Sequence, residues 1–176
     1  MLFYLPVLKM ENPGKNDLLN KISARLEARR KGEKVDLDFS GFDLSGADLT
    51  LWDFSACNLD GSNLSRADLS QANLETASLK GANLRGAILN FARVQEADFS
   101  GADLEGANLW HTRLGDALLV GANLQNANLR SAEMQYVDLT NANLSGADLS
   151  YADLRGANLE GTVLTNTRQI NTKMKS

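Results

Sequence analysis

The chain has 176 residues, of which 43% are hydrophobic and 23% are charged, and its formal net charge is −4. This composition is ordinary for a water-soluble protein with one packed core. It excludes an internal disulfide, because Cys57 is the only cysteine, and a structural zinc site, because His111 is the only histidine. No run of residues approaches the roughly 18 consecutive apolar side chains of a membrane-spanning helix, so no membrane association is expected.

Charge is distributed unevenly along the chain. Residues 38–166 contain 17 acidic residues against 7 basic ones, a net charge of −10, whereas the two flanking segments contain 11 basic residues against 5 acidic ones, a net charge of +6. An acidic middle region repels nucleic acid, so direct binding of nucleic acid is not expected. A basic or DNA-binding protein stays open as a partner.

Residues 1–15 are expected to form a poorly ordered N-terminal extension. The apolar stretch MLFYLPVLK has no basic segment before it and no small-residue cleavage site after it. It is therefore a poor signal peptide, and a cytoplasmic location is expected. Met10 is an alternative start of the protein, and it would remove the apolar stretch.

Residues 16–36 are expected to contain a helix and the segment that leads from it into the following repeats. In the sequence NDLLNKISARLEARRKG, Asn16 or Asp17 can cap the start of the helix and Gly32 can end it. Basic residues near its end suit the negative end of the helix dipole. Its apolar stripe consists of Leu18, Leu19, Ile22 and Leu26.

From residue 37 onward, a pattern of five residues repeats without interruption, as in NLSGADLSYADLRGANLE at 143–160. Its apolar centre recurs at every fifth residue from Phe39 to Leu164, which gives 26 units, 21 of them with Leu. Two residues before the centre, at what we call the inner position, 18 of the 26 units have Ala. One residue before the centre, at the ladder position, 19 units have Asp or Asn.

Neither a helix nor a continuous strand explains a strict spacing of five. A helix would spread the centres around all its sides, and a strand would point alternate centres to opposite faces. The chain must therefore turn at each unit, with the centres and the inner positions facing the interior of stacked coils.

These repeats resemble those of the pentapeptide-repeat family over residues 37–166. The resemblance implies an all-β solenoid, namely a right-handed quadrilateral parallel β-helix with four of the five-residue units in each coil. The 26 units of this chain would then make about six and a half coils.

The residue two positions after each centre is called the corner residue. With four units in each coil, the corner residues fall into four columns, each of which contains every twentieth residue. Two columns, which begin at Gly41 and Gly46, are mostly Gly and Asn and predict type II turns, whose third residue has a positive φ. The other two columns begin at Leu51 and Ala56 and hold larger residues. They predict turns of a different kind.

The two ends of a stack of coils need a cover. The helix within 16–36 is expected to be an N-terminal cap, because the inner positions of the first coil are bulky, and Cys57 among them is interpreted as a core residue. Residues 167–176 are expected to be a polar tail that covers the last coil only partly, so weak end-to-end association of the monomer is an alternative. The bulky inner residues are Leu37, Phe42, Trp52 and Cys57.

Most departures from Asp or Asn at the ladder position lie between residues 88 and 133. In a stack with four units per coil, residues 20 apart lie next to each other on adjacent coils. The residues that depart from Asp or Asn, together with nearby corner residues, then form an apolar and basic patch on an acidic solenoid. Trp and Arg dominate protein-binding hot spots, which favours a functional role, whereas free drift of a repeat surface is the alternative explanation. The candidate protein-binding patch consists of Ile88, Phe91, Arg93, Trp110, His111, Arg113 and Arg130.

The sequence shows no nucleophile paired with a base, no phosphate-binding glycine loop and no pair of carboxylates in distinct environments. We therefore expect no enzymatic activity and no cofactor. A metal site is not expected either, because the Asp and Asn column suits hydrogen bonds to the local backbone.

The leading functional hypothesis is a scaffold or regulatory module that binds an unidentified protein partner through its rigid sides. The resemblance implies a sharper alternative, a DNA mimic that binds DNA gyrase or topoisomerase. Against it, members of that group are typically longer rods that dimerise through a C-terminal helix. A role confined to structural packing in a larger assembly is a third alternative.

Overall fold

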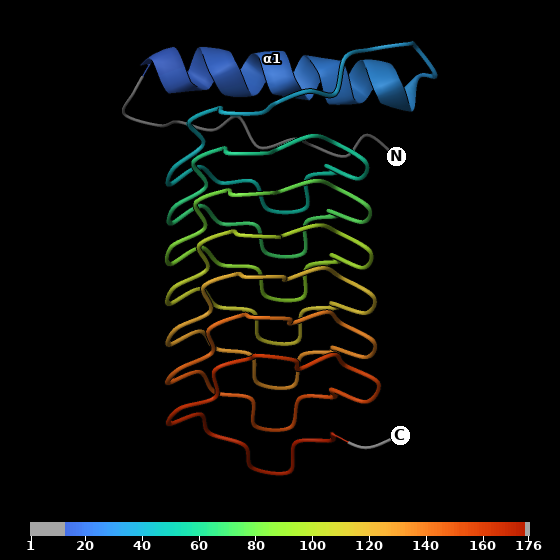
Figure 1. The fold of residues 1–176 in the computed structure, drawn as a ribbon. Coiled ribbons are helices and arrows are strands. Elements are labelled where there is room, and N and C mark those ends of the chain that lie inside the picture. The colour runs from blue at the N-terminus through green and yellow to red at the C-terminus, as the bar shows by residue number, and fades with distance from the viewer. Residues whose placement is uncertain (1–12, 175–176) are drawn as a thin grey trace. The chain divides into compact units, whose positions relative to one another are not determined.

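The structure, a computed structural model, describes residues 13–174, which divide into two units at Asp36 and Leu37. The first unit contains one helix, α1 (Pro13–Arg30), and the second is a solenoid of stacked coils (Figure 1). The predictions for MLFYLPVLK, for Met10 and for the order of residues 1–12 lie outside the described residues. Among the residues that are described, no helix combines the length and the apolar character that a membrane span needs.

Helix α1 begins three residues earlier than the sequence predicted. Pro13 suits the first turn of a helix, because its fixed φ is helical and the first turn does not need its missing N–H group. The prediction that Gly32 ends the helix is confirmed: its φ is +82°, its N–H donates to the carbonyl of Arg29 at 2.8 Å, and that of Glu33 donates to the carbonyl of Ala28 at 3.1 Å. The capping role of the helix stays a prediction.

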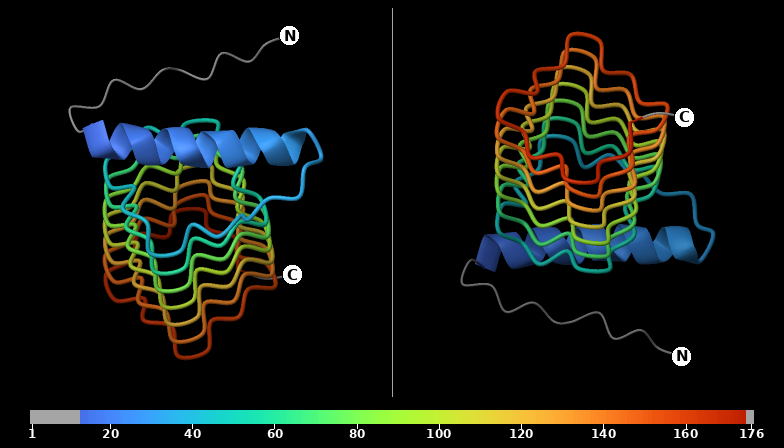
Figure 2. Two further views of the ribbon diagram at one scale, coloured as in Figure 1. Left: turned by 90° about the horizontal axis from the view of Figure 1, so that it is seen from above. Right: turned by 90° about the horizontal axis from the view of Figure 1, so that it is seen from below.

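Single parallel β-bridges join each coil to the next, from Asp38↔Asn58 to Asp153↔Lys173. Each bridge lies at a ladder position. The N–H of Phe39, for example, donates to the carbonyl of Asn58 at 2.8 Å, and the N–H of Asn58 donates to the carbonyl of Leu37 at 3.0 Å. Each coil therefore contains four five-residue units, and the backbones of successive coils overlie one another when seen along the stack (Figure 2). The paired segments stay this short because the chain turns again within each unit.

The centres and the inner positions of the repeats fill the interior of the solenoid. From Phe39 to Leu154 every centre is buried, and the Ala residues at the inner positions from Ala47 to Ala152 are buried beside them. Cys57 is 1% exposed, which agrees with its interpretation as a core residue. Leu and Ala thus fill most of this interior, and the larger Trp52 and Val137 are also buried at inner positions.

All four columns of corners adopt the same turn, so the prediction of two kinds of turn was wrong. Every fifth residue from Gly41 to Asn171 has a positive φ, including Leu51 at 67° and Thr76 at 57°. From Phe39 to Leu164, each turn is closed by a hydrogen bond to the carbonyl of its centre, as from the N–H of Ala47 to Leu44 at 3.1 Å. A side chain larger than Gly is tolerated at the corner because it points into solvent, so its cost is only the local backbone strain.

The solenoid also continues beyond Leu164, where we predicted a polar tail from residue 167. Arg168 pairs with Asp148, and Lys173 pairs with Asp153. The inner Thr172 donates its hydroxyl to the carbonyl of Leu149 at 2.8 Å. The backbone ladder therefore extends the coil although the centre at residue 169 is a glutamine.

Candidate protein-binding surface

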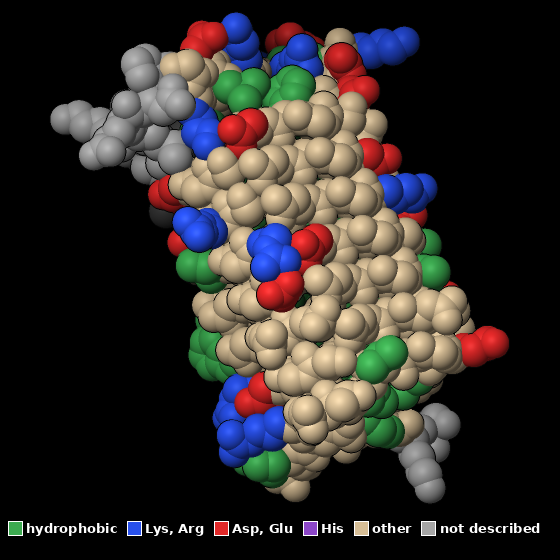
Figure 3. Space-filling model, turned by 60° about the vertical axis from the view of Figure 1, so that its left-hand side comes forward, with side chains coloured by type: hydrophobic (Ala, Val, Ile, Leu, Met, Phe, Trp, Pro, Cys, Tyr) green, Lys and Arg blue, Asp and Glu red, His purple; other side chains and the backbone are tan. Residues whose placement is uncertain are grey.

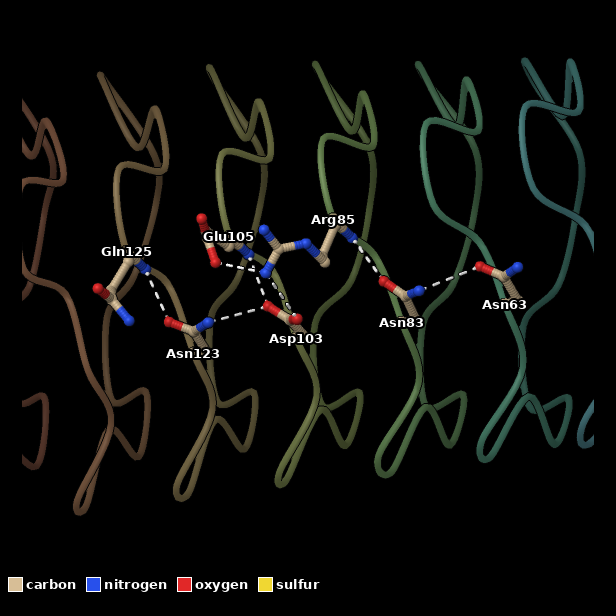
Figure 4. Close-up of polar contacts among 7 residues, drawn as sticks. All are labelled: Asn63, Asn83, Arg85, Asp103, Glu105, Asn123 and Gln125. Carbon is tan, nitrogen blue, oxygen red and sulfur yellow. Dashed lines mark hydrogen bonds and ion pairs between the residues drawn. The ribbon is translucent and has the colours of Figure 1, made fainter.

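The Asp and Asn side chains at the ladder positions bond to the local backbone, as predicted, and they also bond to one another between coils (Figure 4). The Oδ1 atom of Asn83 accepts a hydrogen bond from the backbone N–H of Arg85 at 3.1 Å, and its Nδ2 donates to Oδ1 of Asn63 at 3.2 Å. Likewise, Nδ2 of Asn123 donates to Oδ1 of Asp103 at 3.0 Å. These side chains have structural partners, and among residues 13–174 no three His, Cys, Asp or Glu side chains gather as a metal site would require.

Most basic side chains of the solenoid form ion pairs with acidic side chains nearby. On the face that Figure 3 shows, several acidic side chains adjoin basic ones, and most of the surface between them is backbone and side chains that are neither charged nor hydrophobic. Of the seven basic residues in 38–166, only Arg66 and Arg113 lack an ion pair with a described residue. The paired ones are Lys80 with Asp98, Arg85 with Asp103 and Glu105, Arg93 with Glu75, Arg130 with Asp148, and Arg155 with Asp153.

Three residues of the predicted patch form an exposed aromatic cluster, which consists of Phe91, Trp110 and His111. The Phe91 and His111 rings stack at 5.5 Å with an angle of 6° between their planes. Trp110 packs edge-on against both, at 4.8 Å from Phe91 and 4.6 Å from His111. Because Phe91 and Trp110 are still 48% and 37% exposed, the cluster presents apolar area to solvent.

The backbone of the solenoid positions the cluster. Phe91 and His111 occupy equivalent corners of adjacent coils, with φ of 59° and 54°, so their side chains point outward next to each other. The N–H of Trp110 donates to Oδ1 of Asn108 at 3.3 Å, which holds the turn at this coil. The regular backbone thus brings the rings of Phe91, from one coil, and of Trp110 and His111, from the next coil, together at one edge of the solenoid.

Arg93 and Arg113 follow one another on the face beside the cluster, where their backbones form a parallel bridge. Arg93 donates to Oε1 of Glu75 from Nε at 3.0 Å and from Nη2 at 2.6 Å. Arg113 has no such partner among the described residues, so its charge is available to a ligand.

The remaining two residues of the predicted patch have other roles. Arg130 pairs with Asp148 at 3.4 Å, and its guanidinium lies 5.8 Å from the ring centre of Tyr151. Burial acts to raise the pKa of Asp148, but hydrogen bonds from Ser150 and Arg130 outweigh it, so that this pKa lies below its ordinary value. Ile88 is half-buried on the face that precedes the cluster.

An open depression of about 570 Å³ lies beside the cluster. It includes four residues of the predicted patch and three that the sequence analysis missed, Leu51, Gln71 and Glu133. The missed corner residues were recognisable in the sequence, because Leu51 and Gln71 precede Phe91 in the same column of corners. The depression is lined by Leu51, Gln71, Phe91, Arg93, His111, Arg113 and Glu133.

The sequence matches the family model "Pentapeptide repeats" in overlapping copies that together span residues 36–173. This match covers most of the chain and includes the last bridged residue, Lys173. No curated protein sequence matches the chain significantly.

Several solved structures are similar to this chain. One is QnrB1, a plasmid-mediated fluoroquinolone resistance protein, with 24% identity, a TM-score of 0.59 and coverage of 80% of this chain and 83% of that one. At this identity the likeness shows the solenoid fold alone. A pentapeptide repeat protein from Nostoc PCC 7120 has 31% identity over 84% of this chain and 94% of that one, with a TM-score of 0.31. One from the Arabidopsis thaliana thylakoid lumen has 34% identity over 67% and 65%, with a TM-score of 0.34.

Proposed function

The chain belongs to the pentapeptide repeat family, and we propose that it is a non-enzymatic scaffold or regulatory module that binds a protein partner through the aromatic cluster and Arg113. The match is to a repeat family and not to an enzymatic one. For the fold, we propose the right-handed quadrilateral β-helix that the family resemblance implies; its backbone bridges continue to Lys173, beyond the six and a half coils predicted for residues 37–166.

The observation that carries this proposal is the exposed stack of Phe91, Trp110 and His111 beside Arg113, which forms no ion pair with a residue of 13–174. Exposed rings next to an available guanidinium are the composition of binding hot spots, in which a few such side chains supply most of the free energy of binding. Elsewhere the ladder positions hold mainly Asp and Asn, which bond within the solenoid. The cluster differs from that surface because rings of two adjacent coils present apolar area together.

A photo-crosslinking experiment tests the proposal. Benzoylphenylalanine replaces Phe91 in one variant and Tyr136 in a matched control. Both positions are exposed aromatic corners, with φ of 59° and 58°. Irradiation in lysate is expected to attach a defined partner through position 91 only, and the triple variant Phe91→Asn, Trp110→Ser, Arg113→Ser is expected to lose that partner. Asn is used at position 91 because it tolerates a positive φ. Equal crosslinking at both positions would count against the proposal.

A second candidate function is a DNA mimic that binds DNA gyrase or topoisomerase, and the net charge of −10 over residues 38–166 favours it. Its test is the inhibition of DNA supercoiling by purified gyrase. Under this alternative, inhibition is unaffected by the triple variant and is weakened by neutralising Asp residues at the ladder positions. The absence of inhibition at saturating protein would exclude it.

A further inference from the structure

The depression beside the aromatic cluster has two parallel rows of unlike chemistry. Leu51, Gln71, Phe91 and His111 follow one another at equivalent corners of successive coils and form an uncharged row with two apolar side chains, Leu51 and Phe91, and the ring of His111. Arg93, Arg113 and Glu133 form the other row at ladder positions of successive coils. From Leu51 to Glu133 the depression crosses five coils, or about 19 Å at about 4.8 Å per coil. An extended segment of about six residues has this length, at about 3.3 Å per residue.

In the charged row the two arginines are followed by Glu133, which forms a backbone bridge with Arg113 but no ion pair with its side chain. Arg93 and Arg113 are neighbours on the ladder, and like charges directly opposite each other on paired strands are unfavourable. Glu75 offsets the charge of Arg93, at 2.6 Å, but no described residue forms an ion pair with Arg113. A carboxylate from outside would relieve this repulsion.

We propose that the depression binds an extended acidic segment of a partner protein, with a carboxylate on Arg113 and an apolar side chain against the Phe91–His111 stack. Alternate side chains of an extended chain point to opposite sides, so a segment with alternating acidic and apolar residues places one kind on each row. This inference rests on the proposed function and adds the chemistry of the partner. Single-stranded nucleic acid also suits Arg beside aromatic rings. The net charge of −10 over 38–166 opposes both anionic ligands, but it opposes a polyphosphate with a charge on every nucleotide more than a segment with acidic residues at alternate positions only.

The test uses three fluorescein-labelled probes and fluorescence anisotropy at low salt. The probes are a capped hexapeptide of alternating Asp with Leu or Phe, the same peptide with Lys in place of Asp, and a short oligothymidylate. We expect the acidic peptide to bind at least about tenfold more tightly than the other two. Tighter binding of the lysine peptide or the oligonucleotide would overturn the inference, and so would the absence of binding by all three.

Two charge variants locate the binding site. Arg113→Gln is expected to weaken binding of the acidic peptide by about three- to tenfold, and Glu133→Gln is expected to strengthen it by a similar factor. Leu118→Ser serves as a matched control, because Leu118 is 40% exposed outside the depression and should leave binding unchanged. Circular dichroism shows whether each variant is folded. The same loss of binding in Leu118→Ser as in Arg113→Gln would contradict the proposed site.

The outcome for this inference is separable from that for the proposed function. If the peptides fail while crosslinking from position 91 still captures a partner, the protein-binding role stands and the acidic segment is wrong. If the acidic peptide binds but position 91 behaves like position 136 in lysate, the depression recognises acidic segments and the assignment of a partner to the aromatic cluster falls.

Discussion

The hydroxyl of Thr112 donates a hydrogen bond of 2.7 Å to the carbonyl oxygen of Leu89 inside the solenoid. Thr112 stands at an inner position that most units fill with Ala, and it is fully buried. Ser62 is equally buried at another inner position, but its hydroxyl has no hydrogen-bond partner among residues 13–174. Of these two hydroxyl groups at inner positions, that of Thr112 has a hydrogen-bond partner and that of Ser62 has none among the described residues.

Ser62→Ala should therefore raise the free energy of unfolding by about 1 kcal/mol, because an unpaired buried hydroxyl costs about that much. Thr112→Ala should lower it by about 1–2 kcal/mol, because both a hydrogen bond and a buried methyl group are lost. Urea unfolding followed by circular dichroism measures both changes. Destabilisation by Ser62→Ala would show that its hydroxyl contributes to the fold.

The corners provide a second prediction, in the form of a reciprocal exchange. Thr76 is a β-branched residue with a φ of 57°, whereas Gly81, at the next corner, has a φ of 61° and open space where a Cβ would lie. Thr76→Gly should stabilise the protein by about 1 kcal/mol, and Gly81→Thr should destabilise it by about 1–2 kcal/mol, since left-handed backbone strains a β-branched residue such as Thr but not Gly. Thermal unfolding measures both. Effects of the same sign would contradict a common turn at the two corners.

The sequence predicted the interior of the solenoid well and its corners poorly, for a physical reason. An interior centre such as Leu104 has few acceptable replacements, because it is fully buried beside Ala102. A corner such as Thr76 is exposed, so many residue types are accepted there even though its φ is positive. The columns with few Gly residues therefore gave no sign of the positive φ that they share with the other two columns. The spacing of four units per coil was enough to place Phe91 beside His111.

Contacts that depend on side-chain direction could not be predicted from spacing. The pairing of Arg93 with Glu75 on the preceding coil leaves Arg113 as the available charge, although both arginines depart equally from the repeat pattern. The polar composition of residues 167–174 likewise concealed their part in the ladder, because the backbone bonds of Arg168 and Lys173 do not depend on an apolar centre.

A third prediction concerns the exposed Tyr136, whose ring lies over Gly156 on the next coil. A Cβ at Gly156 would come within 2.6 Å of Cε1 of Tyr136, at a backbone φ of +74°. Gly156→Ala should therefore lower the free energy of unfolding by about 1–3 kcal/mol, partly through backbone strain and partly through displacement of the ring. In a Tyr136→Ser background the same substitution should cost only the strain, about 1–2 kcal/mol. An equal cost in both backgrounds would show that the ring moves away freely.

The final prediction is a dependence of stability on pH through Asp153, which is 8% exposed. Its carboxylate accepts hydrogen bonds from Nε of Arg155 at 2.8 Å and from Nη2 at 2.6 Å, and from Nε2 of Gln135 at 2.9 Å. The side chain of Arg155 is the largest cause that lowers the pKa of Asp153 to about 2, against the opposing effect of burial. Because the pKa is lower in the folded protein, this stabilisation is complete above about pH 4 and is lost as the pH falls towards 2.

Asp153→Asn should therefore lower the free energy of unfolding at pH 7 by about 1–2 kcal/mol, and the difference from the native protein should shrink between about pH 4 and pH 2. Arg155→Met, which removes the main partner of the carboxylate, should reproduce most of the effect. Thermal unfolding of the variant and of the native protein at a series of pH values measures this difference in the free energy of unfolding. Because the other carboxylates titrate in both proteins, their contribution cancels in the difference. A difference that is unchanged at pH 2 would mean that the substitution alters packing and not charge, and it would contradict the assignment of the stabilisation to the ionised carboxylate.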